Sequence, residues 1–132
     1  MSKKKVLFVC VENSCRSQIA EGLLKKLGGG FWDVWSAGST PTGTVNPTAI
    51  ALMKERGVDL AAHRSKGLSD LPGGPWDYVV TMGCGDACPF VPSRAKMDWA
   101  VPDPKNMPRD EFAKIIDAIE AKVAGLIDEA KN

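Results

Sequence analysis

The 132-residue sequence has no long hydrophobic run, no marked surplus of charge of either sign and only one histidine. Its apolar stretch near the start, Val6 to Val11, is too short to span a membrane, and no cleavage site of a secretion signal follows it. The 17 basic and 16 acidic side chains give a net charge of +1, so no broad positive field favours nucleic acid. We therefore expect a cytosolic protein that binds neither a membrane nor nucleic acid.

Cysteine is present at four positions, 10, 15, 84 and 88. Because the cytosol keeps thiols reduced, we expect these residues to be catalytic, redox-active or metal-binding and not to form structural disulfides. The spacings Cys-x4-Cys and Cys-x3-Cys come near those of a structural zinc site, which is one alternative. Arg16 would have no use beside a zinc ion, and the chain is long enough to build a core without one. We expect no bound metal.

Apolar patterns typical of strands alternate with patterns typical of helices. Strands are predicted at 5–9, 31–36, 78–82 and 96–101, and helices at 17–27, 46–57 and 108–127. Gly28 to Gly30 should end the first helix, while Asn46 and Pro47 should cap and start the second. The alternation predicts one three-layer α/β domain with a parallel sheet. We expect this domain to be a monomer.

The segment from Cys10 to Ser17 joins the first predicted strand to the first predicted helix. Ligands of open α/β sheets bind beyond the carboxyl ends of the strands, and a loop that leads into a helix can turn its N–H groups toward an anion. Arg16 can pair with two oxygens of a tetrahedral anion at once. The same positive environment favours the thiolate of Cys10, to which Ser17 can donate its hydroxyl. We predict that Cys10 attacks an oxyanion held in this loop.

The predicted oxyanion-binding loop consists of Val11, Glu12, Asn13, Ser14, Cys15 and Arg16. Of these, Cys15 is expected to contribute its backbone amide, and its thiol to be incidental.

The segment from Val9 to Gln18 resembles the signature of the low-molecular-weight protein tyrosine phosphatases and of the arsenate reductases that share their fold. Similar motifs continue in the family's order as Ser36-Ala37-Gly38, Val45-Asn46-Pro47, His63-Arg64-Ser65, Val79-Val80-Thr81-Met82 and Asp103-Pro104. The resemblance covers residues 1–132 as a single domain. It implies a four-stranded parallel sheet flanked by helices.

Three further features decide between the two branches of this family. Cys84 and Cys88 follow the third strand and resemble the shuttle-cysteine segment of thioredoxin-coupled arsenate reductases. Gln18 stands where the phosphatases usually carry proline, and Lys105 follows Asp103-Pro104 where they typically carry tyrosines. The resemblance therefore implies an arsenate reductase. A phosphatase acting on phosphotyrosine or a small phosphate ester is the alternative, and some phosphatase activity is expected in either case.

The resemblance also implies a mechanism. Cys10 attacks arsenate, and Asp103 protonates the leaving oxygen. A second cysteine attacks the Cys10 sulfur, arsenite leaves, and a third cysteine carries the disulfide to an external reductant. Proximity to the strand end favours Cys84 as the second cysteine, and exposure favours Cys88 as the third. The external reductant is thioredoxin, or a low-molecular-weight thiol with a glutaredoxin-like protein, and no cofactor is bound.

Some of these reductases hold a potassium ion behind the loop, and Asn13, Glu21 and Ser36 match residues associated with that site. Lys66 stands where an acidic ligand would complete it. The Lys66 ammonium can take the place of the cation and support the loop through Asn13 and Glu21. The alternative is that Lys66 points to solvent. His63 is expected to be a packing residue without a catalytic role.

A third alternative is a non-catalytic phosphate sensor built on an inactive phosphatase. The presence of Cys10, Arg16 and Asp103 together argues against it.

Overall fold

The computed structural model describes residues 3–83 and 91–130, so Cys84 and Cys88 lie outside the described residues. The described strands are β1 (Lys4–Cys10), β2 (Trp32–Gly38), β3 (Trp76–Thr81) and β4 (Ser93–Asp98). They pair in parallel in the order β2-β1-β3-β4. The prediction of a four-stranded parallel sheet is confirmed.

The fourth strand lies earlier in the chain than expected, at Ser93–Asp98 and not at 96–101. It is an edge strand whose residues alternate between half-buried and exposed, so it lacks the apolar run that marks β1. The apolar residues that suggested the later position, Trp99 and Val101, are buried after the chain has left the sheet. Trp99 packs its ring against Phe8, with ring centroids 5.6 Å apart.

The three α-helices are α1 (Arg16–Gly28), α2 (Pro47–Glu55) and α3 (Arg109–Ala130), and short 3-10 helices lie at Gly29–Phe31 (η1) and Leu68–Asp70 (η2). The Asn46 side chain accepts hydrogen bonds from the N–H groups of Thr48 and Ala49, which caps α2 as predicted. The glycines end α1 as predicted, although Gly28 still belongs to the helix. No helix of the described residues is long and apolar enough to cross a membrane.

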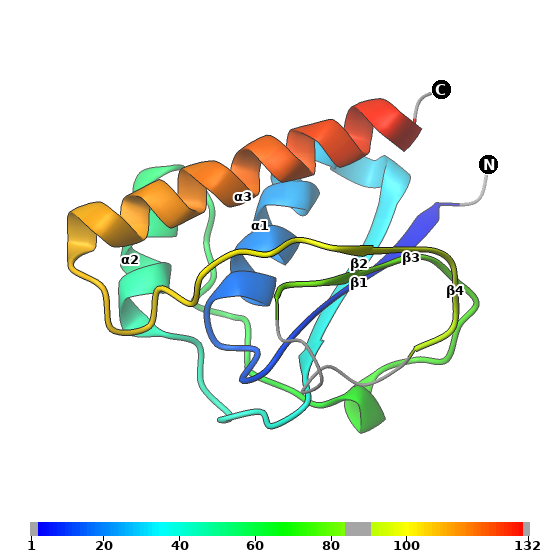
Figure 1. The fold of residues 1–132 in the computed structure, drawn as a ribbon, viewed down its shortest axis with the longest axis horizontal. Helices are drawn as coiled ribbons and strands as arrows, with labels where there is room; N and C mark the ends of the chain where they lie inside the picture. The colour runs from blue at the N-terminus through cyan, green and yellow to red at the C-terminus, as the bar shows by residue number, and fades with distance from the viewer. Residues whose placement is uncertain (1–2, 84–90, 131–132) are drawn as a thin grey trace.

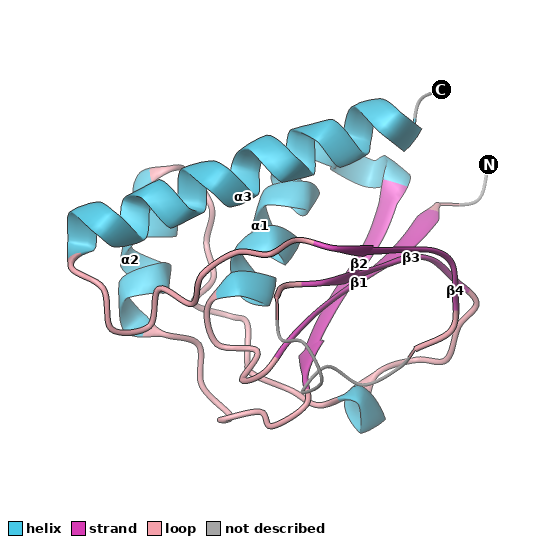
Figure 2. Ribbon diagram, in the orientation of Figure 1, coloured by secondary structure: helices cyan, strands magenta, loops and turns pink. Residues whose placement is uncertain are grey.

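The sheet separates two apolar clusters, which form the core. Figures 1 and 2 show α1, α2 and α3 on one side of the sheet and η2 on the other. One face carries Val6, Phe8 and Val80, and it belongs to the same cluster as buried residues of all three α-helices. The other face carries Leu7, Val9 and Val79, packed with Trp35, Trp76, Leu68, Leu71 and Val91. A layer that contains η2 therefore covers this second face in the described part of the chain.

The sheet positions the segment that follows β1. Because β1 is a central strand, its last residue, Cys10, lies beside Gly38 at the end of β2. On the other side, Val9 lies beside Thr81 at the end of β3, and the carbonyl of Val9 accepts a hydrogen bond from the N–H of Met82. The loop after Cys10 is thus enclosed by the ends of two neighbouring strands, where ligands of such sheets bind.

Candidate active site

The loop between β1 and α1 is held by hydrogen bonds to its carbonyl groups. The carbonyls of Cys10 and Val11 accept from the N–H groups of Ser39 and Thr40 at 3.2 and 2.8 Å. The carbonyl of Glu12 accepts from the Ser65 hydroxyl at 2.6 Å. These outward contacts leave the peptide N–H groups of the loop available to its centre, and the N–H of Asn13 points at the Cys10 sulfur.

The Cys10 sulfur is buried and contacts two hydrogen-bond donors. It accepts a hydrogen bond from the N–H of Asn13 at 3.2 Å and lies 2.8 Å from the Ser17 hydroxyl oxygen. The Asn13 side-chain amide donates to the same Ser17 oxygen at 2.7 Å. The Ser17 proton is therefore free to point at the sulfur, so that two donors are directed at this one atom.

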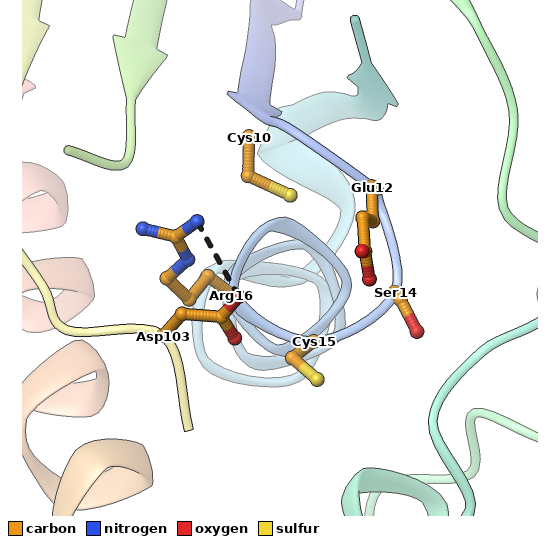
Figure 3. Close-up of a pocket in the computed structure, with 6 residues that line it drawn as sticks. All are labelled: Cys10, Glu12, Ser14, Cys15, Arg16 and Asp103. Carbon is orange, nitrogen blue, oxygen red and sulfur yellow. Dashed lines mark ion pairs between the residues drawn. The ribbon is translucent and has the colours of Figure 1, made fainter. Parts of the chain in front are cut away.

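Arg16 begins α1, and its guanidinium reaches across to the ends of β3 and β4. One terminal nitrogen donates to the carbonyls of Met82 and Val101 at 2.6 and 3.1 Å. The other terminal nitrogen lies 4.0 Å from a carboxylate oxygen of Asp103, as the dashed line in Figure 3 marks. The arginine is buried, whereas the Asp103 side chain is 44% exposed. A buried positive charge thus faces the loop, with an exposed carboxylate beside it.

These groups surround a small hollow that is open to solvent, with about 180 Å³ of free space. Its lining residues are Cys10, Glu12, Ser14, Cys15, Arg16 and Asp103 (Figure 3). Five of these six residues come from the segment predicted to hold the anion, and Asp103 is brought to it from a position 93 residues after Cys10.

Cys15 also lines the hollow, but its thiol stays protonated and is therefore a poor nucleophile. The pKa of Cys15 is raised to about 12, mainly by burial, and the negative charges of Asp103, Cys10 and Glu12 contribute to the same rise. Cys15 is therefore a neutral thiol near pH 7, while Cys10 has the two donors described above.

A layer of buried polar side chains lies behind the loop. The Gln18 amide donates to the Asn13 side-chain oxygen and to the carbonyl of Arg64, both at 2.9 Å. The His63 Nδ1 atom lies 2.9 Å from the Gln18 side-chain oxygen. The sequence singled out Gln18 only for its resemblance to reductases and took His63 as packing. Their contact joins positions 45 residues apart, and no local pattern in the sequence indicates it.

The predicted support residues also come together in this layer. The Lys66 ammonium lies 3.7 Å from a Glu21 carboxylate oxygen and 3.4 Å from the Ser36 hydroxyl oxygen, and Ser36 donates to Glu21. Lys66 contacts Asn13 through its backbone N–H, at 2.9 Å from the Asn13 side-chain oxygen, and not through the expected ammonium. The ammonium thus reaches Glu21, one of its two expected partners, and also Ser36, the third residue associated with the cation site.

The buried setting and the neighbouring charges shift the pKa values of Glu21 and Lys66. Burial would raise the pKa of Glu21, but hydrogen bonds from Lys25 and Ser36 and the charge of Lys66 outweigh it and hold that pKa below its usual value. Burial lowers the pKa of Lys66, and Glu21 partly offsets this effect. Glu21 is therefore ionised behind the loop at neutral pH.

Within residues 3–83 and 91–130, no group of three or more His, Cys, Asp or Glu side chains could hold a metal ion. Two of the four cysteines of the zinc alternative, Cys84 and Cys88, lie outside the described residues.

Residues 5–132 match the family of low molecular weight phosphotyrosine protein phosphatases. The chain belongs to this family. It is 42% identical over 127 residues to arsenate reductase 2 of Staphylococcus haemolyticus, which covers 93% of this chain and 95% of that protein. The resemblance read from Val9 to Gln18 is confirmed.

Solved structures give the same result for the fold. An arsenate reductase in its phosphate-binding state is 36% identical with a TM-score of 0.85, over 96% of this chain and 98% of that chain. A thioredoxin-dependent arsenate reductase of Corynebacterium glutamicum is 34% identical with a TM-score of 0.79. That comparison covers 98% of this chain and 63% of the other. The chain therefore has the fold of these enzymes along nearly its whole length.

Proposed function

We propose that this protein reduces arsenate to arsenite through a covalent adduct on Cys10. The observation that carries the proposal is the setting of the Cys10 sulfur, which meets donors from Asn13 and Ser17 at the base of a loop whose far end is Arg16. A thiolate needs such donors to act as a nucleophile near neutral pH. The similarity to proteins named arsenate reductases supports the choice of substrate.

In the first step, the Cys10 thiolate attacks the arsenic atom, so that a sulfur–arsenic bond forms and one arsenic–oxygen bond breaks. Asp103 lies beside Arg16 at the hollow and donates a proton to the departing oxygen, which leaves as water. The loop N–H groups and Arg16 hold the remaining negative oxygens.

In the second step, the Cys84 thiolate attacks the Cys10 sulfur, and the electron pair of the sulfur–arsenic bond stays on arsenic. Arsenic is thereby reduced from As(V) to As(III) and leaves as arsenite, while Cys10 and Cys84 are oxidised to a disulfide. Cys88 then attacks Cys84, which frees Cys10 and leaves a Cys84–Cys88 disulfide. Since both cysteines lie outside the described residues, this step is supported by the sequence motif alone.

The disulfide requires an external source of two electrons. We propose thioredoxin, because one relative is named thioredoxin-dependent, or else a low-molecular-weight thiol with a glutaredoxin-like protein. Arsenite formation should be measured with each system separately, beside hydrolysis of an aryl phosphate. Arsenite formation with neither system, in a protein that hydrolyses aryl phosphate efficiently, would favour the phosphatase alternative.

The order of the two cysteines has its own test. The Cys88→Ser variant should release one arsenite per protein and stop with a Cys10–Cys84 disulfide, whereas the Cys84→Ser variant should stop at the adduct. Peptide mapping after one exposure to arsenate identifies the disulfide. A Cys10–Cys88 disulfide formed in the Cys84→Ser variant at the wild-type rate would reverse the two assignments.

We propose that residues 1–132 act as a single domain and as a monomer in the cytosol, where the thiols of the relay stay reduced between turnovers. Sedimentation of the reduced protein gives the oligomeric state. A concentration-independent dimer would contradict the proposal.

A further inference from the structure

An ion pair lies at the rim of the hollow and joins its two sides. The Lys105 ammonium lies 2.8 Å from a Glu12 carboxylate oxygen, and the Lys105 backbone N–H donates to a carboxylate oxygen of Asp103 at 3.1 Å. Glu12 and Asp103 line the hollow on opposite sides (Figure 3). Lys105 therefore connects the loop after β1 to the segment that follows β4.

Both ends of this connection are anchored. The Glu12 carbonyl accepts from the Ser65 hydroxyl at 2.6 Å, and the Glu12 side chain is 29% exposed. On the other side, the carbonyl of Val101 accepts from Arg16, and Pro104, next to Lys105, is buried. The ion pair therefore spans a gap between fixed backbones and is not a contact between two loose segments.

The charges explain why the pair matters for an anion site. Two carboxylates, Glu12 and Asp103, stand at the entrance, and each would repel an incoming oxyanion. The ammonium of Lys105 offsets the charge of Glu12. The hydrogen bond and the charge of Glu12 raise the pKa of Lys105, so that the lysine stays charged at neutral pH.

The position of the pair also bears on the leaving group. Cys10 attacks from the base of the loop, so the bond that breaks points away from the sulfur, toward Asp103 and the rim. With inorganic arsenate the leaving group is a single oxygen. With a phosphate monoester, the leaving oxygen carries an organic group that must pass the rim.

We propose that the Glu12–Lys105 ion pair is a specificity element, which admits an unsubstituted tetrahedral oxyanion and disfavours phosphate monoesters with bulky leaving groups. This inference rests on the proposed function for its natural substrate. Its test is independent of arsenate reduction, because aryl phosphate hydrolysis and inhibition by inorganic phosphate require the loop, Cys10 and Asp103 but not the relay through Cys84 and Cys88.

The test uses the double variant Glu12→Gln, Lys105→Ala, which removes one negative and one positive charge together. The quantity measured is the ratio of kcat/KM for an aryl phosphate to the association constant of inorganic phosphate, taken from competitive inhibition. We expect this ratio to rise about fivefold, the upper range for loss of an exposed ion pair. Lys105→Arg keeps the pair and should keep the wild-type ratio.

A matched control removes another exposed ion pair, Glu55–Arg109, through the double variant Glu55→Gln, Arg109→Ala. That pair joins α2 to the start of α3, and neither residue lines the hollow, so its loss should leave the ratio unchanged. Thermal unfolding of each variant shows that it is folded.

Two results would overturn the proposal. One is an unchanged ratio in the folded Glu12→Gln, Lys105→Ala protein. The other is a tenfold or larger loss of phosphate affinity in Lys105→Ala alone, with the ratio unchanged, which would make Lys105 a ligand of the anion. If the wild-type protein failed to reduce arsenate while the ratio still rose, the proposed function would fall and the specificity element would remain.

Discussion

The two sides of the Cys10–Arg16 loop are built differently. The inner side consists of Asn13, Ser17, Gln18, Glu21 and Ser36, which are all buried. The outer side consists of Glu12, Asp103 and Lys105, whose side chains are 29%, 44% and 48% exposed. No buried side-chain nitrogen or oxygen in the described part of the chain lacks a hydrogen-bond partner, so the inner side is fully satisfied.

Asn13 illustrates the difference. Its backbone is in the left-handed region, with φ of 52°, and its side-chain oxygen accepts from both Gln18 and the Lys66 backbone. Its amide group donates to Ser17. Lys105, in contrast, is held by one contact to Glu12 and one to Asp103 in reach of water. Changes on the inner side should therefore alter the reactivity of the sulfur toward every substrate, and changes on the outer side the choice among substrates.

The largest effect is expected for Cys10→Ser, because it removes the sulfur nucleophile on which the roles of both the inner and the outer side of the loop depend. A serine hydroxyl is not ionised in this loop, so arsenite release and aryl phosphate hydrolysis should both fall by at least about 10³-fold. Calorimetric titration should still detect binding of phosphate, because the loop and Arg16 remain. Substantial turnover by the variant would exclude Cys10 as the nucleophile.

A large effect is also expected for Gly38→Ala, at the end of β2. A Cβ atom there would lie 2.5 Å from the Val11 carbonyl oxygen and 2.8 Å from the Asn13 backbone nitrogen. Since both are backbone atoms, the loop itself must shift, which should cost about 1–3 kcal/mol of stability. Activity toward arsenate and aryl phosphate should fall together by at least about tenfold, because the donors to Cys10 move. Urea unfolding and kcat/KM measure the two effects.

Gly125→Ala is the matched control. Gly125 lies in α3, and a Cβ atom there would meet nothing within 4 Å. This substitution should stabilise the protein by about 0.5–1 kcal/mol and leave activity unchanged. If Gly38→Ala behaved in the same way, the close approach of β2 to the loop would have no functional role.

The sequence predicts features that depend on neighbouring residues better than features that depend on distant ones. The apolar run of β1, the cap at Asn46 and the stripe of α3 depend on neighbouring residues, and the structure has these elements. The first and last residues of β4 could not be predicted from the sequence. An edge strand such as β4 lacks a continuous apolar run, and Trp99 is buried although it lies outside the strand.

The contacts of the site show the same difference between neighbouring and distant residues. The Cys10-to-Ser17 segment is local, so the sequence predicted that the Ser17 hydroxyl meets the Cys10 sulfur. The contact between His63 and Gln18, and the ion pair between Glu12 and Lys105, join positions 45 and 93 residues apart. Such contacts depend on how β2, β3 and the loops after them are arranged, and a single sequence does not contain that information.

A smaller effect is expected when the monovalent cation in solution, or Lys66 behind the loop, is changed. Because the Lys66 ammonium already lies near Glu21 and Ser36, replacing sodium by potassium at equal ionic strength should change wild-type kcat/KM by less than about twofold. Lys66→Met removes one of the groups that stabilise the buried Glu21 carboxylate and leaves Lys25, Ser36 and His63, so activity should fall several-fold. Lys114→Met removes an exposed lysine of α3 and serves as the control. A several-fold activation of the wild-type protein by potassium would show that Lys66 does not take the place of a cation.

The smallest effect concerns the pH dependence of stability through His63. Burial lowers the pKa of His63, Glu21 opposes this effect, and Lys25 and Lys66 add to it. With a pKa below its usual value in the folded protein, His63 binds fewer protons there than in the unfolded chain. Its contribution to stability is therefore present above the unfolded pKa of about 6.5 and is lost as the pH falls from that value through the lower pKa of the folded protein. The free energy of unfolding in urea should decrease from about pH 7.5 to about pH 5.5, and it should decrease less in His63→Gln. An equal decrease in both proteins would mean that the contact between His63 and Gln18 does not couple the inner side of the loop to pH.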